Sequence, residues 1–461
     1  MSTIKRRTFL KNTLAAGTGA YLLGLAPGCQ TSGTKTVTKG PGNKLNVGFI
    51  GVGGQGSGHV REISQTENLV AFADVDDERA GEIYAEFPQV PRYRDFRVML
   101  DRHGKELDAV LICTPDHIHF VATLACMERG IHVFTEKPLT HNIWQARTLI
   151  KAADYYNVIT AMGNQGHATE GIRYIKEWYD AGVLGEVREV LAWFNGPDID
   201  GYYFKRPDQY PLPAMPVPDH LDYDLWKGPV VTDIPYNSDM VPIKWRGHFA
   251  FGCAELGDWA CHTLDGPNWA LDLGAPVATE LLRHETKFPT RYAPDKSVVR
   301  FEFAAKGDRP PVTLTWHDGG IKPENRPEWG LEELDGNGMI MVGSKATLMT
   351  GGRPNSPRLI PESDWMDFRK NMPPKVIPRV KGSHVKEWTS AIKGEGPMPG
   401  SDFAYGGKLT ELSLVGVLAQ RFGGRIEYDE DNMRITNRPE LNAFIKEPVR
   451  PGWEAGDNLW V

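Results

Sequence analysis

The chain has 461 residues, with 52 Lys and Arg against 59 Asp and Glu and a formal net charge of −7. Apolar residues make up 41% and charged residues 24%, which is typical of a soluble globular protein and excludes a disordered or collagen-like chain. The acidic balance argues against nucleic acid or an anionic membrane as the main partner, because both are bound by a basic face. Five cysteines are too few and too irregularly spaced for a disulfide framework or a four-thiolate zinc site.

Residues 1–29 have the pattern of an export signal. Arg6 and Arg7, followed by Thr-Phe-Leu-Lys, resemble a bacterial twin-arginine signal, and the apolar run after them is shorter than the ~20 residues of a membrane span. Cys29 closes an imperfect lipoprotein cleavage box, so a lipid anchor there is a further expectation. We expect export to the periplasm; the alternative is a disordered basic N-terminus. Residues 30–43 are polar and rich in Gly and Thr, as linkers are.

A glycine-rich turn follows the first predicted strand, residues 44–50. Gly51, Gly53 and Gly56 form G-x-G-x-x-G at the start of a predicted helix, the context typical of a dinucleotide-binding site. Gly51 allows the tight turn, Gly53 lets the backbone approach a pyrophosphate, and Gly56 lets helix and strand pack closely. Gln55 lies inside the motif and is a further candidate for cofactor contact.

The second predicted strand, residues 69–73, ends in Asp74. A carboxylate at this place binds the 2′-hydroxyl of a ribose and repels a 2′-phosphate, so NAD is favoured over NADP. Glycines alone would indicate no more than a turn. Strand, turn, helix and terminal carboxylate in this order predict a nicotinamide dinucleotide site.

Strands and helices continue to alternate as far as residue 165. Further strands are predicted at 109–112, 131–135 and 158–161, with helices between them. This alternation is typical of a doubly wound parallel sheet, whose ligands bind beyond the carboxyl ends of the strands. Polar residues at such ends are Thr114, Glu136, Lys137 and Asn164.

From residue 166 the pattern changes. A helix over 169–181 is followed by predicted strands without regular helices between them, at 187–194, 277–286, 297–303, 312–316 and 338–342. We therefore expect a Rossmann domain over 44–165 and a C-terminal α+β domain over 166–461, with a large, mostly antiparallel open sheet. The loop-rich segment 195–245 is expected to be functional, because long loops in compact domains usually are.

A helix predicted to open at Gly257 carries Asp258 and His262 four positions apart, so both side chains share one face. In hydride transfer from a carbinol, a histidine can take the hydroxyl proton and a carboxylate can orient it. Lys137, at a strand end, can hydrogen-bond the same oxygen and stabilise developing alkoxide charge. The alternative is that Asp258 caps the helix and His262 packs in the core.

Two further groups have ordinary structural explanations. His117-x-His119 has no cysteine or carboxylate cluster to complete a metal site, so we expect no metal. Cys261 is adjacent to His262, but neighbouring helix residues point about 100° apart, so Cys261 is expected in the core and not at the site.

Several residues of the loop-rich segment are candidates for substrate contact. Arg246 and His248 are candidate hydroxyl or anion contacts, with ordinary surface positions as the alternative. Five aromatic residues are equally compatible with stacking on sugar faces and with loop packing: Tyr202, Tyr203, Tyr210, Trp226 and Trp245.

Together the motifs resemble the Gfo/Idh/MocA family of NAD(P)-dependent oxidoreductases. The markers are Gly51-x-Gly53-x-x-Gly56, Thr114-Pro115-Asp116-x-x-His119, Glu136-Lys137-Pro138 and Asp258-x-x-x-His262. The resemblance implies that Lys137 and His262 flank the reacting carbinol and that Asp258 supports them. It implies that the cofactor site is contacted or shaped by Gly51, Gly53, Gly56, Asp74, Thr114, Pro115, His119, Glu136 and Asn164. His167 stands where many relatives carry an arginine at the substrate.

The resemblance implies an enzyme that transfers a hydride to or from a carbinol carbon of a sugar, glycoside or polyol. Since free NAD is not expected outside the cytoplasm, an exported enzyme would hold its cofactor tightly and recycle it. One alternative is an NAD-dependent glycoside hydrolase that works by transient oxidation and elimination; another is a non-catalytic sugar or nucleotide sensor. The presence of Lys137 and His262 favours the dehydrogenase. The resemblance also implies a homo-oligomer, a dimer or a tetramer.

Overall fold

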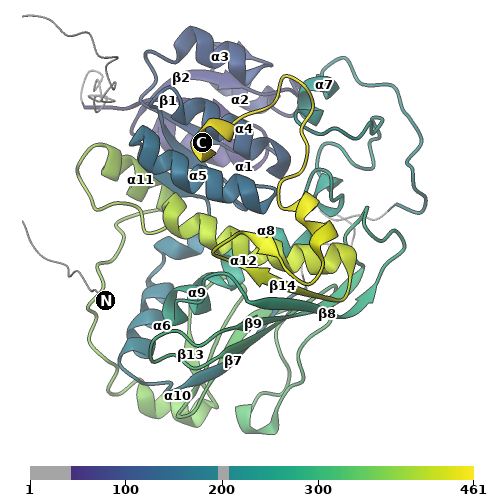
Figure 1. The fold of residues 1–461 in the computed structure, drawn as a ribbon. Helices are drawn as coiled ribbons and strands as arrows, with labels where there is room; N and C mark the ends of the chain where they lie inside the picture. Colours follow the sequence, from purple (N-terminus) through teal and green to yellow (C-terminus); the bar gives the residue numbers. More distant parts are fainter. Residues whose placement is uncertain (1–42, 196–206) are drawn as a thin grey trace, which may run out of the picture. The chain divides into compact units, whose positions relative to one another are not determined.

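The computed structural model describes residues 43–195 and 207–461. The predicted export signal with Cys29, the predicted linker up to residue 42, and Tyr202 and Tyr203 lie outside the described residues. Two sheets organise the rest, one of six strands and one of nine (Figure 1). The predicted fold class, a doubly wound parallel sheet followed by an α+β domain with a mostly antiparallel sheet, is confirmed. In the described ranges no helix has the length and apolar character needed to cross a membrane.

The six-stranded sheet is parallel throughout, in the order β3-β2-β1-β4-β5-β6. Its strands are β1 (Asn46–Ile50), β2 (Asn68–Ala73), β3 (Arg92–Tyr93), β4 (Ala109–Ile112), β5 (His132–Thr135) and β6 (Thr160–Met162). The connecting helices are α1 (Gln55–Ser64), α2 (Gly81–Glu86), α3 (Phe96–His103), α4 (Asp116–Met127) and α5 (Ile143–Tyr156). Every residue of β4 is buried, as expected for a strand of a sheet covered on both faces.

The direction in which the chain builds this sheet changes at β1. This strand has β2 on one side and β4 on the other, so the following helices lie on opposite faces of the sheet. In doubly wound sheets the ligand crevice lies at such a point, beyond the carboxyl ends of the strands. We therefore expect the ligand to bind at the turns that follow β1, β2, β4 and β5.

The nine-stranded sheet has the order β13-β12-β11-β7-β10-β9-β8-β14-β15, and its described pairs are antiparallel except β7 with β10. The predicted strands correspond to β7 (Val187–Phe194), β8 (Ala278–Glu285), β9 (Lys296–Phe303), β10 (Val312–Asp318) and β11 (Asn337–Gly343). The two outermost strands at each end of the sheet were not predicted: β12 (Thr347–Thr350) and β13 (Arg358–Ile360) at one end, β14 (Arg425–Asp429) and β15 (Arg434–Ile435) at the other. These four are short, and a short apolar run gives little periodicity to detect.

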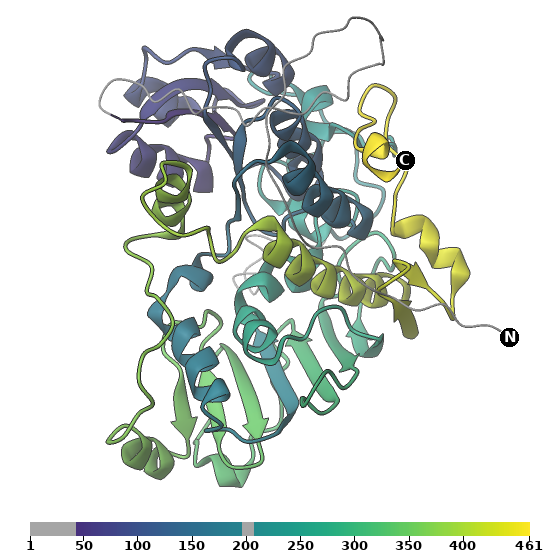
Figure 2. The same ribbon diagram turned by 60° about the vertical axis from the view of Figure 1, so that its left-hand side comes forward.

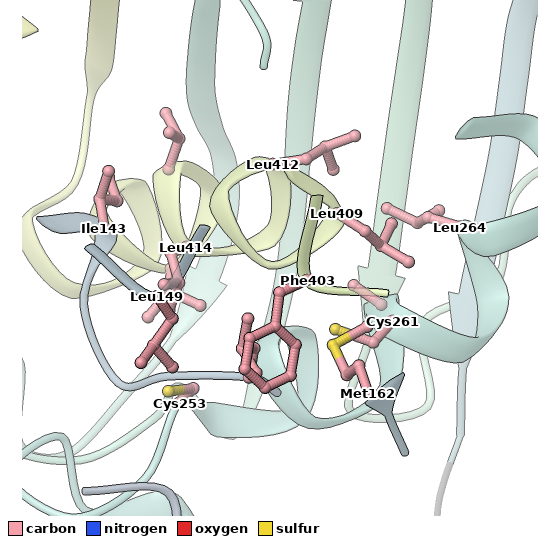
Figure 3. Close-up of a cluster of buried hydrophobic side chains, with 14 of the residues drawn as sticks. Ile143, Leu149, Met162, Cys253, Cys261, Leu264, Phe403, Leu409, Leu412 and Leu414 are labelled. Carbon is pink, nitrogen blue, oxygen red and sulfur yellow. The ribbon is translucent and has the colours of Figure 1, made fainter. Parts of the chain in front are cut away.

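A long helix that the sequence analysis did not predict, α12 (Phe403–Phe422), packs against both domains. It contacts α5 of the first domain, and it contacts β8, β9 and α8 (Ala254–Thr263) of the second (Figures 1 and 2). Leu409 and Leu412 of α12 belong to the same buried cluster as Met162 and Cys261 (Figure 3). Because α12 is buried on almost all sides, it lacks the polar stripe that marks an amphipathic helix in a sequence.

Helix α8 begins earlier than predicted. It starts at Ala254, and Cys253 occupies the capping position. Asp258 therefore lies in the second turn, and the alternative in which it caps this helix is wrong. The remaining helices of the second domain are α6 (Glu170–Asp180), α7 (Tyr223–Lys227), α9 (Asp265–Leu271), α10 (Glu362–Phe368) and α11 (His384–Ile392).

Candidate active site

A cavity of about 490 Å³ opens at the carboxyl ends of β1, β2, β4 and β5 and extends to α8. Both domains contribute to its wall. The predicted site residues that line it are Gly51, Gly53, Gln55, Asp74, Thr114, Pro115, His119, Glu136, Lys137, Trp245, Arg246, Asp258 and His262. Three other predicted residues, Gly56, Asn164 and His167, do not line it.

The glycine turn closes one end of the cavity. Gly51 has a φ of +84°, and a Cβ atom there would lie 2.4 Å from the carbonyl oxygen of Cys113. A Cβ atom at Gly56 would lie 2.2 Å from the carbonyl oxygen of Gly51, so α1 approaches the turn this closely only with a glycine. The first turn of α1 carries no acidic residue, which leaves its N-terminal partial charge available to an anion. The glycine turn and the first turn of α1 therefore fit the pyrophosphate of a dinucleotide.

Asp74 contacts this turn and also faces the cavity. Its Oδ2 accepts hydrogen bonds from the backbone N–H groups of Val52, at 2.9 Å, and Gly53, at 3.2 Å. Its Oδ1 accepts one from the backbone N–H of Asp76 at 3.1 Å. Burial raises the pKa of the Asp74 carboxyl above its usual range, although the backbone donors oppose that shift. Its carboxylate thus presents an acceptor close to the glycine turn.

Lys137 and Asp258 bring the two domains together inside the cavity. The Lys137 Nζ donates to Oδ1 of Asp258 at 2.9 Å and to its backbone carbonyl oxygen at 3.1 Å. Burial alone would lower the pKa of Lys137, but the carboxylates of Asp258 and Glu136 outweigh it and the net direction is upward. Lys137 is therefore a stable ammonium group that retains donor capacity beyond the Asp258 bonds.

His262 lies one turn after Asp258 and is almost fully buried. Its ring packs edge-on against Trp259, with centroids 5.3 Å apart. Burial, and after it the positive charges of Lys137 and Arg353, hold the pKa of His262 well below its usual range. Within the described part of the chain its Nδ1 has no hydrogen-bond partner. A neutral imidazole of this kind can accept a proton from a bound hydroxyl group.

Glu136 precedes Lys137 and is held by α1. The ring Nε2 of His59 lies 2.8 Å from Oε1 of Glu136. Burial alone would raise the pKa of Glu136, but the hydrogen bond with His59 and the nearby Lys137 lower it to about 2. Glu136 is therefore a carboxylate at neutral pH.

The Thr114-Pro115 turn leads into α4, where the two histidines of His117-x-His119 are tied to backbone. The ring nitrogens of His119 lie 2.7 Å from the carbonyl oxygen of Pro138 and 2.9 Å from that of Thr114. Both ring nitrogens of His117 also lie within hydrogen-bond distance of backbone carbonyl oxygens. These two histidines join neighbouring loops and are not arranged as a metal-binding pair.

Trp245 and Arg246 lie on a short 3-10 helix, Lys244–Gly247, at the end of the cavity nearest Asp258. The Arg246 guanidinium lies 4.4 Å from the centroid of the Trp245 ring. Its Nε lies 3.6 Å from Oδ1 of Asp258. This end of the cavity thus combines an aromatic face with two cations, those of Arg246 and Lys137, around one carboxylate.

The other loop candidates divide between wall and core. Trp226 lines the cavity. Tyr210 packs against the rings of His248 and Tyr292, with centroids 5.8 Å from each, and does not line it. His248 is buried in the same aromatic group and is also absent from the wall.

Asn164 and His167 lie behind the wall and meet at Asp265. The carboxylate of Asp265 accepts hydrogen bonds from Asn164 Nδ2 at 3.0 Å and from Tyr405 Oη at 2.6 Å, and lies 2.9 Å from His167 Nδ1. Asp265 is fully buried. The group connects the end of β6 to α9 and α12, so these two predicted residues shape the site through the fold and not by lining the cavity.

Sequence reasoning missed several wall residues. Arg79 lies over the glycine turn, since a Cβ atom at Gly54 would lie 2.5 Å from its guanidinium. Gln165, Trp259, Arg353 and Trp453 are further wall residues that were not predicted. Arg353 comes from the segment between β12 and β13, two short strands that were not predicted, so no sequence signal pointed to it. Trp453 ends the segment Arg450-Pro-Gly-Trp453 near the C-terminus.

Both domains match models of a known protein family. Residues 45–164 match the NAD-binding Rossmann fold of the GFO_IDH_MocA oxidoreductase family. Residues 170–283 match the C-terminal alpha/beta domain of the same oxidoreductase family. The two matches together cover just over half of the chain.

Individual relatives match about a third of the chain. The UDP-N-acetylglucosamine 3-dehydrogenase of Acidithiobacillus ferrooxidans is 32% identical over 133 residues, 29% of this chain and 41% of the relative. The inositol 2-dehydrogenase of Pseudomonas fluorescens is 32% identical over 166 residues, 34% of this chain and 48% of the relative. The chain thus spans less than half the length of these two relatives.

Solved structures extend the similarity to both domains. The WlbA dehydrogenase of Bordetella pertussis, solved in complex with NADH and UDP-GlcNAcA, aligns with a TM-score of 0.58 at 18% identity. The alignment covers 84% of this chain and 98% of that one. At this identity the similarity shows a common fold.

Proposed function

Because the chain belongs to the Gfo/Idh/MocA family of oxidoreductases, we propose that it is an NAD-dependent dehydrogenase of a sugar, glycoside or polyol. The observation that carries this proposal is that Lys137, Asp258 and His262 line the same cavity as the glycine turn. When bound, NAD supplies the acceptor or donor of a hydride at a carbinol carbon. The relatives support the substrate class, since one is named for UDP-N-acetylglucosamine and the other for inositol.

Lys137 and His262 act on the same substrate oxygen, one by hydrogen bonding and the other by proton transfer. His262 is held neutral by burial and by nearby cations, so it accepts the hydroxyl proton as the carbonyl group forms. The Lys137 ammonium donates to the same oxygen and stabilises its developing negative charge. In the reverse direction His262 returns the proton. Asp258 holds the ammonium in place at 2.9 Å and keeps its charge stable.

The rest of the wall binds the two ligands. Gly51, Gly53 and Gln55 with the start of α1 would hold the pyrophosphate, and Asp74 would accept from a ribose hydroxyl. Thr114, Pro115, His119 and Glu136 would complete the cofactor wall, with Gly56 allowing its close packing. Trp245 and Arg246 would contact the substrate, as an aromatic face and a donor group. Asn164 and His167 would act through Asp265.

We also propose that the protein is exported by the twin-arginine route and keeps its nicotinamide bound. Arg6, Arg7 and the short apolar run support export, and Cys29 supports a lipid anchor. Fractionation of the native host with and without an Arg6→Lys, Arg7→Lys substitution tests the route. Cytoplasmic location of the wild type would contradict it.

A homo-oligomer formed through the nine-stranded sheet is a further part of the proposal. Strand β9 alternates buried and half-exposed residues, so one face of it is turned away from the core. Light scattering of the purified protein measures the assembly, and a monomer at micromolar concentration would contradict it.

One experiment separates this function from its two alternatives. The purified protein is denatured and the released nucleotide is assayed; then intact protein is offered a panel of glycosides and polyols. A dehydrogenase releases nicotinamide nucleotide when it is denatured. The intact dehydrogenase changes its absorbance of reduced nicotinamide when one of the glycosides or polyols is added. A redox-neutral hydrolase cleaves a glycoside without net absorbance change. A sensor shows neither an absorbance change nor glycoside cleavage. If no nucleotide is released and no reaction is seen, the proposal that the protein is an enzyme is overturned.

A further inference from the structure

Two histidines and a carboxylate converge beside the cavity from three distant segments. His59 lies on α1, Glu136 follows β5, and His384 is the first residue of α11. One ring nitrogen of each histidine and one carboxylate oxygen of Glu136 lie within 4.8 Å of one another. The proposed hydride transfer uses neither histidine.

Two members of this cluster are buried and the third is partly buried, and packing holds all three. His59 is 3% exposed and Glu136 7%, while His384 has intermediate exposure. The ring of Phe134 packs against both histidine rings, with centroids 5.6 Å from His59 and 5.3 Å from His384. The two imidazole rings are themselves edge-on, with centroids 5.9 Å apart. The donors are therefore pre-arranged by an apolar neighbour and not by mutual hydrogen bonds alone.

Hydrogen bonding satisfies only part of the cluster. His59 Nε2 lies 2.8 Å from Oε1 of Glu136, and Oε2 of Glu136 accepts from the backbone N–H of Lys137 at 3.2 Å. The Nε2 atom of His384 is buried and has no hydrogen-bond partner among the residues the structure describes. Leaving a buried polar atom unpaired destabilises the folded state, so an additional partner at this position would stabilise the fold.

The donor set is that of a transition-metal site. Two imidazole nitrogens and one carboxylate oxygen are the ligands found around zinc in three-residue sites that keep a fourth position open. Donors that each lie about 2.1 Å from Zn²⁺ in tetrahedral geometry are about 3.4 Å apart. In this cluster His59 Nε2 and Glu136 Oε1 are 2.8 Å apart, and all three donors lie within 4.8 Å of one another.

We propose that His59, Glu136 and His384 bind one divalent transition-metal ion, of which Zn²⁺ fits the donor set best. The ion would join α11, which lies between β13 and β14 in the chain, to α1 and β5 of the Rossmann domain. Its position behind Glu136 places it at the border of the cofactor cavity, since Glu136 also lines that cavity. Lys137 does not compete for the ion's carboxylate, because its ammonium is bonded to Asp258.

Metal binding is tested without reference to catalysis. The full chain, produced without a polyhistidine tag, is treated with chelator, dialysed against Zn²⁺ or Mg²⁺, and analysed by inductively coupled plasma mass spectrometry. We expect one Zn²⁺ per chain and no retained Mg²⁺, which prefers oxygen ligands. His384→Ala and His59→Ala should reduce bound zinc to background. His103→Ala is the matched control, because His103 also pairs with a glutamate, Glu106, but has no third ligand; it should bind zinc like the wild type.

A folding defect is kept separate from a binding defect. His384→Asp replaces one ligand by another, so it should fold and retain zinc more weakly than the wild type but above His384→Ala. Circular dichroism and released nucleotide report on the fold of each variant. Wild-type protein that retains no zinc, or His384→Ala that retains as much as the wild type, would overturn the site and would leave the proposed dehydrogenase intact.

Discussion

Lys137 follows β5 of the Rossmann sheet and Asp258 lies in the second turn of α8, yet the ammonium of one lies 2.9 Å from the carboxylate of the other. The side chains are 16% and 9% exposed, so the pair is largely removed from water. Removing one member of such a pair leaves a buried charge uncompensated. The pair therefore links the position of the Lys137 ammonium, the group proposed to act on the substrate oxygen, to the packing of the two domains.

Lys137→Ala should abolish turnover while leaving the nucleotide bound. The ammonium is the group proposed to stabilise charge on the substrate oxygen, and loss of such a donor typically lowers kcat by about 10²–10³-fold. Arg246, whose Nε is 3.6 Å from Asp258, limits the charge imbalance. Released nucleotide and kcat are the measurements. Lys176→Ala, which breaks a surface pair with Asp180, is the control and should change neither; unaltered turnover in Lys137→Ala would remove Lys137 from its role.

Asp258→Asn should move the alkaline limb of the rate profile to lower pH. In the wild type the carboxylate, together with Glu136, raises the pKa of Lys137 against the effect of burial. Without this charge the ammonium deprotonates at lower pH, so its donor function is lost earlier as pH rises. The kcat/KM profile between neutral and alkaline pH measures the shift. Asp180→Asn on the surface of α6 should leave the profile unchanged, and an identical alkaline limb in both variants would refute the coupling.

Gly51→Ala should prevent nucleotide binding and destabilise the Rossmann domain. Gly51 has a φ of +84°, and the added Cβ would lie 2.4 Å from the Cys113 carbonyl oxygen, which is backbone and cannot rotate away. A residue forced into such strain costs of order 1–3 kcal/mol, and the contact adds to that. Gly58→Ala is the matched control, because a Cβ there meets nothing within 4 Å inside α1. It should be stable or gain up to ~1 kcal/mol. Thermal unfolding and nucleotide content compare the two.

Buried histidines should make the protein lose stability as pH falls below about 6.5, the ordinary histidine pKa. Burial lowers the pKa of His117 and of His248 to about 3, and it also lowers that of His262. Between about pH 6.5 and 3 the unfolded chain binds these protons and the folded chain does not, so each such group costs about 1.4 kcal/mol per pH unit. Above about pH 6.5 the contribution is constant.

The pH prediction is measured by thermal or urea unfolding between pH 8 and pH 5, the range in which roughly the first half of this loss falls. His248→Gln should show a shallower loss of stability than the wild type. His284→Gln, at an exposed position near the end of β8, is the control. Equal slopes in the wild type and His248→Gln would contradict the assignment to buried neutral imidazole.

Local order along the chain was enough to establish much of the first domain. The strand, glycine turn, helix and carboxylate from residue 44 to Asp74 depend on contacts between near neighbours, and buried parallel strands are visible as short continuous apolar runs. The residues after strand ends, such as Lys137, could be grouped because parallel strands bring their carboxyl ends to one edge. The long helix α12 was missed because complete burial removes the polar stripe.

What only the tertiary structure decided is which of these residues meet. Asp258 and His262 reach the nucleotide cavity because α8 packs between the two domains, and no spacing in the sequence encodes that distance. Asn164 and His167, which the family resemblance placed at the cofactor and the substrate, turn instead to Asp265 behind the wall. His59, Glu136 and His384 come from three segments without a shared motif, whereas the pair His117-x-His119 has the close spacing and is tied to backbone. The sequence by itself determined the elements and the chemical groups they carry; long-range packing, which depends on the volume and shape of the whole core, decided their neighbours.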